Sequence, residues 1–281
     1  MLVAITGAFG FIGRAVASRA LSKGHDVLAL TRRAVPSSAG LKVQCVSTYG
    51  EARPPLGGGI LVHLAEERDM AAIQRAPAAY RAAQTEALKA LLTAGWDHVV
   101  YVSSAAVYGD GLAAARLESD TPDPRNAYSE LKLACETLAM SHGASVARLS
   151  NVYGPGMASN SVIGDMLAQI DTPGPLRLRD GQPVRDYLWV GDAADGLARM
   201  AAIRPRGPIN LASGEAISVS GLARLFLEEL GQPDRALALG AASGKVSHLE
   251  VSTELAQRSL GWQAGTRLRQ GLAVLIGQYK S

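Results

Sequence analysis

The chain has 281 residues, of which 48% are hydrophobic and 19% are charged, and its formal net charge is +3. A chain of this length can bury the core of one large domain or of two closely joined ones, and the composition is typical of a soluble globular enzyme. The small net charge and the absence of long runs of like charge give no reason to expect nucleic acid as a partner.

The sequence also gives no sign of a membrane partner, a disulfide or a metal site. No apolar run approaches the roughly 18 residues of a spanning helix, and the chain enters a predicted strand at once, which leaves no room for a signal peptide. Cys45 and Cys135 have no Cys-x-x-Cys spacing, and the five histidines are scattered. We therefore expect a cytoplasmic protein with two reduced thiols and no bound metal.

Short apolar runs alternate with stretches of helical periodicity in the first half of the chain. Strands are predicted at residues 2–5, 26–30, 41–46, 60–65, 98–102 and 145–149, and helices at 11–21, at 68–94 with a break near Pro77, and at 126–138. This alternation predicts an α/β fold built on a parallel, doubly wound, Rossmann-type sheet. Ligands of such sheets bind outside the carboxyl ends of the strands.

A glycine-rich turn follows the first predicted strand. Gly7, Gly10 and Gly13 have the spacing Gly-x-x-Gly-x-x-Gly and lead directly into a predicted helix. Glycines allow a tight turn and a close approach of the backbone to a diphosphate, and the first N–H groups of the helix can bind phosphate oxygens. The turn therefore predicts a dinucleotide site, which would include Phe11 and Ile12.

The end of the second predicted strand bears on the choice of cofactor. It carries Thr31, Arg32 and Arg33, and no acid. An acid at this position hydrogen-bonds the adenosine ribose of NAD, whereas an arginine accommodates the 2′-phosphate of NADP. A hydroxyl and two guanidinium groups suit a phosphate, so NADP(H) is favoured and NAD(H) is the alternative. The two arginines could instead be ordinary solvated loop residues.

Tyr128 and Lys132 are four residues apart in the helix predicted at 126–138, so they share one face of it. Leu131, Cys135 and Leu138 continue an apolar stripe beside them, which indicates a packed helix. An ammonium group near a phenol stabilises the phenolate and lets the phenol exchange a proton near neutral pH. Taken alone, however, such a pair is more often a surface lysine beside a half-buried tyrosine.

The sequence changes character after residue 151. Helices are expected at about 161–170, 192–202 and 266–279, and residues 208–212 are expected to return as a strand to the first domain. We therefore interpret residues 1–150 as a NAD(P)-binding Rossmann domain and residues 151–281 mainly as a smaller substrate-binding domain.

A series of motifs resembles the NAD-dependent epimerase/dehydratase family of extended short-chain dehydrogenases, over nearly the whole chain. In order, the motifs are Thr6-Gly7-x-x-Gly10-x-x-Gly13, Ser103-Ser104-Ala-Ala-Val-Tyr108-Gly109, Tyr128-x-x-x-Lys132, Arg148-x-x-Asn151-Val-Tyr153-Gly154-Pro155, Arg185-Asp186-Tyr187, Val190-x-Asp192, Asn210 and Leu260-Gly261-Trp262. One such match is weak evidence, but the set in this order is specific.

The resemblance implies the catalytic groups. Tyr128 would be the general acid/base, and Ser104 would hydrogen-bond the same reacting oxygen, with Ser103 as the alternative hydroxyl. Lys132 would stabilise the phenolate and hold the nicotinamide ribose, and the cofactor would carry the hydride.

The resemblance also implies binding residues. We expect Leu64, Ala65 and Ser103 among the cofactor contacts, and Asn151 and Arg185 at the diphosphate of a nucleotide-sugar substrate. Structural roles are the alternative, in which Asn151 caps a turn and Arg185 pairs with its neighbouring aspartate.

Two departures from the family pattern narrow the expected reaction. Sugar 4,6-dehydratases of the family carry Asp-Glu directly after the catalytic hydroxyl, where this chain has Ala105 and Ala106, and related decarboxylases commonly keep a glutamate in this region. Without these carboxylates, a nucleotide-sugar 4-ketoreductase is favoured. An epimerase of the UDP-glucose 4-epimerase kind is the alternative. The chain lacks the acid that would bind the adenosine ribose of NAD, which favours an NADPH that exchanges with solution over an NAD that stays bound through each cycle.

Two further classes stay open, namely an enzyme of a non-nucleotide carbonyl compound and a non-catalytic NADP-binding regulator. Asn151 and Arg185 argue against the first, and the retained Ser104, Tyr128 and Lys132 argue against the second. The resemblance also implies a homodimer that packs through the Tyr128 helix and the helix near 80–94.

Overall fold

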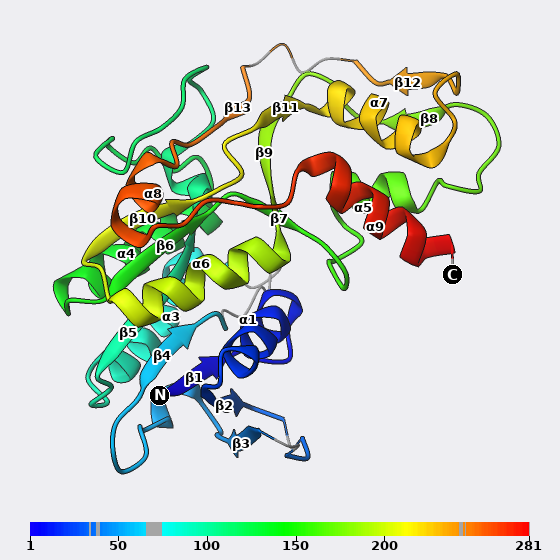
Figure 1. Cartoon of the computed structure of the whole chain (residues 1–281). Coiled ribbons are helices and arrows are strands. Elements are labelled where there is room, and N and C mark those ends of the chain that lie inside the picture. Colours follow the sequence, from blue (N-terminus) through cyan, green and yellow to red (C-terminus); the bar gives the residue numbers. More distant parts are fainter. Residues whose placement is uncertain (34, 38–39, 66–74, 242–243, 245, 281) are drawn as a thin grey trace.

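The computed structural model describes residues 1–33, 35–37, 40–65, 75–241, 244 and 246–280. Within these residues, seven parallel strands form the main sheet in the order β10-β6-β5-β4-β1-β2-β3 (Figure 1). They are β1 (Leu2–Thr6), β2 (Asp26–Thr31), β3 (Leu41–Cys45), β4 (Ile60–His63), β5 (His98–Ser104), β6 (Ser145–Leu149) and β10 (Gly207–Leu211). This sheet confirms the predicted fold class.

The predicted strands agree with the observed ones to within two residues. The strand predicted at 60–65 ends at His63, because the N–H groups of Leu64 and Ala65 both donate to the Thr6 hydroxyl instead of continuing the ladder. Of the helix predicted at 68–94, residues 68–74 lie outside the described residues, and α3 (Pro77–Leu92) follows. Proline suits this start because its missing N–H group would have no partner in the first turn.

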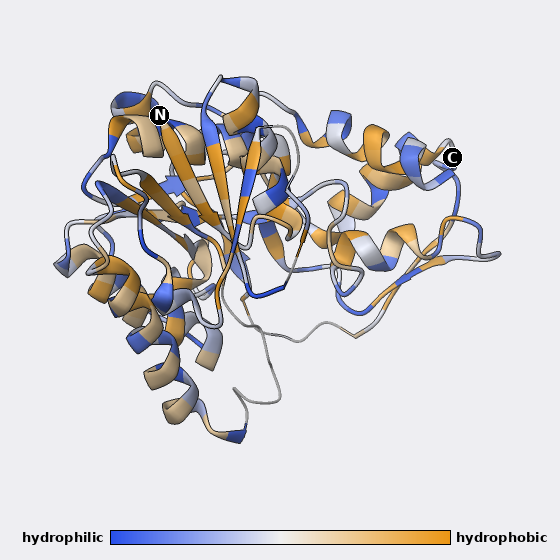
Figure 2. Cartoon of the chain, turned by 90° about the horizontal axis from the view of Figure 1, so that it is seen from below, coloured by the Kyte–Doolittle hydropathy of each residue, from blue (hydrophilic) through white to orange (hydrophobic). Residues whose placement is uncertain are grey.

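Helices cover both faces of the main sheet. One face packs against α1 (Phe11–Ser22) and α6 (Val190–Ile203), and the other packs against α3 and α4 (Ala127–Ser141). The strands are apolar nearly throughout because both of their faces are buried. Figure 2 shows these hydrophobic strands enclosed by helices.

A smaller lobe is formed by the second half of the chain (Figure 1). Its strand β9 (Val184–Trp189) pairs with β7, β11 and β13, and β8 pairs with β12. The other elements are β7 (Asn151–Tyr153), β8 (Leu176–Leu178), β11 (Ala216–Ser218), β12 (Leu237–Leu239), β13 (His248–Leu249), α5 (Val162–Leu167), α7 (Val219–Leu230), α8 (Glu254–Leu260) and α9 (Leu268–Lys280). Strands of two or three residues are too short to show an alternating pattern, so the sequence did not predict them.

The second half of the chain also contributes to the main sheet. As expected, residues 207–211 return as β10, which pairs with β6, and α6 packs against α1. The division at residue 150 into two domains stays a prediction. No helix in the described part of the chain is long and apolar enough to cross a membrane.

Candidate active site

A cavity of about 940 Å³ opens at the carboxyl ends of the main-sheet strands, and residues of the smaller lobe form its other wall. Nine of the residues expected from the sequence line it together: Phe11, Ile12, Leu64, Ser103, Ser104, Tyr128, Lys132, Asn151 and Arg185. The volume is at the upper end of the range for small-molecule sites. The three turn glycines, the Thr31–Arg33 segment and Ala65 are not in this wall.

The glycine turn has the shape that a dinucleotide needs. Gly7 has a positive φ of 70°, and the Gly10 N–H group donates to the Gly7 carbonyl oxygen at 2.9 Å. A Cβ atom on Gly13 would lie 2.0 Å from that same oxygen, so α1 can pack this closely against the turn only with glycine there. No side chain caps the N-terminus of α1, and its first turn carries no acid. The first turn therefore presents backbone N–H groups and positive dipole character to an anion, which fits a cofactor diphosphate.

The polar residues at the end of β2, Thr31 to Arg33, differ in burial and in their contacts. The Thr31 side chain is buried, and its hydroxyl accepts a hydrogen bond from the Arg33 N–H group at 3.0 Å. This contact closes a short turn after the strand. Arg32 and Arg33 are exposed, and the Arg32 guanidinium lies 5.6 Å from the centroid of the Tyr49 ring.

The start of α4 sets the position of Tyr128. Asn126 precedes the helix and forms a reciprocal capping box with Ser129: the Ser129 N–H group donates to the Asn126 side chain at 3.0 Å, and the Asn126 N–H group donates to the Ser129 hydroxyl at 3.2 Å. Such a box satisfies N–H groups that the helix leaves unpaired and defines its first residue. Tyr128 is therefore held in the first turn, at the edge of the cavity.

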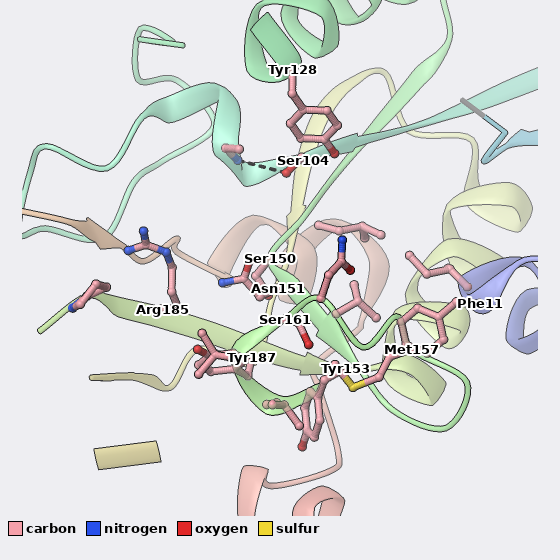
Figure 3. Close-up of a pocket in the computed structure, with 18 of the residues that line it drawn as sticks. Phe11, Ser104, Tyr128, Ser150, Asn151, Tyr153, Met157, Ser161, Arg185 and Tyr187 are labelled. Carbon is pink, nitrogen blue, oxygen red and sulfur yellow. Dashed lines mark hydrogen bonds between the residues drawn. The ribbon is translucent and has the colours of Figure 1, made fainter. Parts of the chain in front are cut away.

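Lys132 follows one turn later and is almost fully buried. Its ammonium donates to the Val102 carbonyl oxygen at 2.8 Å and lies 5.9 Å from the centroid of the Tyr128 ring. The charge is thus fixed between α4 and the end of β5, close to the phenol. Figure 3 shows the hydroxyl groups of Tyr128 and Ser104 pointing into the same part of the cavity.

The two adjacent serines at the end of β5 have different partners. The Ser104 hydroxyl accepts from the Ala106 N–H group at 3.2 Å and lines the cavity. The Ser103 hydroxyl donates to the carboxylate of Glu136, which is completely buried. Ser103 is therefore engaged in the protein interior, and Ser104 is the serine with a hydroxyl available to a ligand.

A buried ion pair beneath the cavity was not predicted. Arg148 on β6 donates to Glu136 from Nε at 3.1 Å and from Nη2 at 2.6 Å, and the side chains are 3% and 0% exposed. Arg148 Nη1 also donates to the Tyr108 hydroxyl at 2.8 Å, and Tyr108 donates to Asn210 Oδ1 at 2.9 Å. The spacing of Glu136 four residues after Lys132 was the available sequence signal, since it continues the same helix face.

Arg185 is held on the cavity wall by partners that the sequence did not suggest. Its Nη2 donates to Asp110 Oδ2 at 3.0 Å and to the Ser247 hydroxyl at 2.7 Å. The neighbouring Asp186 does not pair with it and instead accepts hydrogen bonds from Ser150, Ser213 and Gly214. The guanidinium is thus partly neutralised and fixed in orientation.

Asn151 starts β7 and is exposed to the cavity. Figure 3 shows its amide pointing into the space between Ser104 and the smaller lobe. Among the described residues, none forms a hydrogen bond with this amide, so its polar atoms are directed at the space where a ligand would bind.

Two other tyrosines line the cavity, Tyr153 and Tyr187, and both are buried at their rings. Burial raises the pKa of Tyr187 to about 12 and raises the pKa of Tyr153 as well. Neither phenol can then take up and release a proton readily near neutral pH. Among the described residues, no group of three or more His, Cys, Asp or Glu side chains is arranged to hold a metal ion.

Comparison with known proteins identifies the family. Residues 3–212 match the sequence model of the NAD dependent epimerase/dehydratase family. The chain belongs to this family. It is accordingly an NAD(P)-dependent enzyme of the extended short-chain dehydrogenase type, and the resemblance noted in the sequence is confirmed.

Relatives within the family span nearly the whole chain. The chain is 28% identical to dTDP-6-deoxy-L-talose 4-dehydrogenase (NAD(P)(+)) of Kitasatospora kifunensis, over 97% of this chain and 94% of the relative. It is 25% identical to dTDP-L-rhamnose 4-epimerase of Burkholderia thailandensis, over 97% and 93%. Among solved structures, MoeE5 in complex with UDP-glucuronic acid and NAD superposes with a TM-score of 0.82 at 27% identity, covering 100% of this chain and 99% of that one.

Proposed function

We propose that this chain is an NADPH-dependent nucleotide-sugar 4-ketoreductase. The observation that carries the proposal is that Ser104, Tyr128 and Lys132 line one cavity together with the N-terminal residues of α1. The nicotinamide cofactor supplies the hydride. The full-length relatives named above act, by their names, at C4 of dTDP-linked deoxysugars.

The protein's own residues would handle the proton. The Tyr128 phenol gives its proton to the carbonyl oxygen while a hydride adds to the carbonyl carbon, so the ketone becomes an alcohol. Ser104 donates a hydrogen bond to the same oxygen as negative charge develops on it. The buried ammonium of Lys132 stabilises the phenolate that remains.

The nucleotide part of the substrate would contact Arg185 and Asn151. A guanidinium held by Asp110 and Ser247 keeps one orientation and can bind a diphosphate with little loss of side-chain entropy. The exposed amide of Asn151 can donate to a second oxygen.

Elimination of water from the sugar is disfavoured. The two residues after Ser104 are alanines, which carry no carboxylate. Ala105 is buried and Ala106 lines the cavity. The acids among the described cavity-lining residues are Asp165 and Asp180, which both belong to the smaller lobe.

NADPH is proposed over NADH because of Arg32 and Arg33. Both guanidinium groups are exposed just beyond the end of β2, where the adenosine ribose binds in sheets of this type. We expect Arg32→Ala to weaken NADPH binding on the order of tenfold or more, which is the loss of one charge-assisted contact, and to leave NADH binding unchanged. Fluorescence titration of both cofactors measures this, with Lys42→Ala on β3 as a control; equal losses for the two cofactors would contradict the preference.

A 4-epimerase is the second candidate, because one relative covering nearly the whole chain is a 4-epimerase. A panel of UDP- and dTDP-linked sugars and their 4-keto forms, incubated with NADPH or NAD⁺, separates the two. Steady loss of the nicotinamide absorbance indicates a reductase, whereas exchange of C4 isomers without net loss indicates an epimerase. If no nucleotide sugar reacts, and neither UDP nor dTDP raises the melting temperature, the nucleotide-sugar assignment is wrong.

A further inference from the structure

The residues around Ser104 are tied to the rest of the protein at both ends. We define the Ser104 segment as residues 103–108, which comprise the end of β5 and the short 3-10 helix Ala105–Tyr108. Its first residue, Ser103, donates to Glu136, and its last residue, Tyr108, accepts from Arg148. Glu136 and Arg148 are themselves paired, so a single buried ion pair holds both ends of the segment.

The sheet register explains how these groups meet. Ser103 is the β-partner of Arg148, and Arg148 is the β-partner of Asn210, so the three lie in one row across β5, β6 and β10. Asn210 Oδ1 accepts a hydrogen bond from the Tyr108 hydroxyl, and Asn210 Nδ2 donates to the carbonyl oxygens of Arg116 and Ser252. The row therefore connects the Ser104 segment, which begins in β5, to the two strands β6 and β10 and to two loops.

Helix α4 completes the arrangement. Tyr128, Lys132 and Glu136 are spaced four residues apart and so lie on one face of α4, which is directed at the end of β5. Lys132 bonds the Val102 carbonyl oxygen, and Glu136 bonds the next residue, Ser103. The helix that carries the phenol thus holds the strand that carries the Ser104 hydroxyl.

We propose that Glu136 and Arg148 are positioning residues, which hold the Ser104 segment so that the Ser104 hydroxyl stays within reach of the oxygen that Tyr128 protonates. Their action is indirect, through Ser103 and Tyr108. An error of about 1 Å in such a contact can lower a rate by on the order of 100-fold. This inference rests on the proposed function only for its kinetic part.

The first experiment needs no substrate. Hydrogen–deuterium exchange would be measured on the full chain for two amides that donate to the Ser104 segment: Ala106 N–H, which bonds the Ser104 hydroxyl, and Gly109 N–H, which bonds the Ala106 carbonyl oxygen. Glu136→Gln, and independently Tyr108→Phe, should speed their exchange by on the order of tenfold. Tyr108→Phe keeps the ion pair and the ring, so it serves if Glu136→Gln does not fold. Unchanged exchange in a folded variant would overturn the proposal.

A matched control is available on β6, the strand that carries Arg148. Ser145 is fully buried at the opposite end of β6, where its hydroxyl donates to the Pro205 carbonyl oxygen. Ser145→Ala should lower the melting temperature without altering exchange at Ala106 and Gly109. Faster exchange there in Ser145→Ala would indicate general loosening of the fold and would count against a positioning role.

The second experiment is a double-mutant cycle in turnover, using dTDP-4-keto-6-deoxyglucose with NADPH or UDP-glucose with NAD⁺, whichever pair the wild type converts. Tyr108→Phe should lower kcat by about 10-fold to 100-fold, with KM and cofactor Kd nearly unchanged. In a Ser104→Ala background the same substitution should have no further effect. If the two losses multiply, the ion pair does not act through Ser104. If neither pair is converted, the substrate panel described above tests the proposed function, and the exchange experiment by itself decides the positioning role.

Discussion

The phenol of Tyr128 and the ammonium group of Lys132 lie on one face of α4. Lys132 is buried, so water screens its charge only weakly. The other tyrosines in the cavity wall differ in this respect. Burial raises the pKa of Tyr153 and Tyr187, and neither has a lysine one turn away. We therefore expect the three tyrosines to differ in role, because their neighbours differ.

We expect Tyr128→Phe to lower turnover by about 100-fold to 10,000-fold, the usual contribution of a general acid or base. The ring and its packing are kept, so the affinity for NADPH and the melting temperature should stay near the wild-type values. Steady-state kinetics together with cofactor titration measure both. Tyr279→Phe, at a half-exposed position on α9, is the matched control. Near-normal turnover by Tyr128→Phe would contradict the acid/base role.

The residue pairs that the sequence could predict are local ones. That Tyr128 and Lys132 lie on the same helix face follows from their four-residue spacing and from helical periodicity. The partners of Arg185, which are Asp110 and Ser247, are 75 and 62 residues away in the chain, and no periodic pattern connects them.

At the level of elements, the glycine turn and α1 depend on one another. Gly13 is the first buried residue of α1, and a side chain there would collide with the backbone of Gly7 and Ala8. The helix can approach β1 only because this position has no Cβ atom. The sequence predicted the turn correctly because its glycines are close together in the chain.

Two glycine substitutions test this dependence against each other. Gly13→Ala should destabilise the fold by about 1–3 kcal/mol or more through overpacking, and it should also weaken cofactor binding. Gly277 lies in α9 with open space around its Cβ position, so Gly277→Ala should stabilise the protein by about 0.5–1 kcal/mol. Urea denaturation measures both, and a stabilising Gly13→Ala would refute the close approach.

The first residues of β5 and β6, which lie at the end of these strands away from the cavity, are His98 and Ser145, and they are in contact. His98 Nε2 lies 2.7 Å from the Ser145 hydroxyl. Burial, and to a smaller extent the charge of Arg204, lower the pKa of His98 below its ordinary value of 6.5. The unfolded state therefore binds a proton more readily than the folded state does.

The free energy of unfolding should consequently decrease as the pH falls from about 6.5 through the lower folded pKa, and the His98 contribution should be constant above that range. His98→Gln removes the titrating group and should flatten this part of the curve. Urea midpoints measured between neutral and mildly acidic pH check the sign. A wild-type stability that increases on acidification, with the increase lost in His98→Gln, would contradict it.

For the whole molecule, the cavity wall is assembled from both lobes. Tyr128, Lys132 and Ser104 belong to the main sheet and its helices, whereas Arg185 belongs to a strand of the smaller lobe. The chain crosses between the lobes several times, since β10 returns to the main sheet after β9. Binding of a ligand that touches both walls should therefore depend on how the two lobes are held together.

A homodimer through α3 and α4 stays a prediction. The two helices pack side by side, and α3 leaves Ala78, Ala79, Ala82 and Ala83 exposed. A surface of small side chains lets a second helix pair approach closely. Light scattering should then give about twice the chain mass of 29.3 kDa, and Ala82→Glu should return the mass to that of one chain. Val274→Glu on α9 is the control, and a wild-type monomer would refute the prediction.

The sequence by itself determined the chain order of the main-sheet strands and of the helices α1, α4 and α6 beside them, the glycine turn, and the Tyr128–Lys132 face. Each of these depends on residues within a few turns of one another, where periodicity and backbone geometry decide the structure. Only the tertiary structure decided that Glu136 and Arg148 hold the Ser104 segment, and that Asp110 and Ser247 hold Arg185. These contacts depend on strand order and register, which place residues far apart in the chain in one row of the sheet, and a single sequence carries no local signal for that pairing.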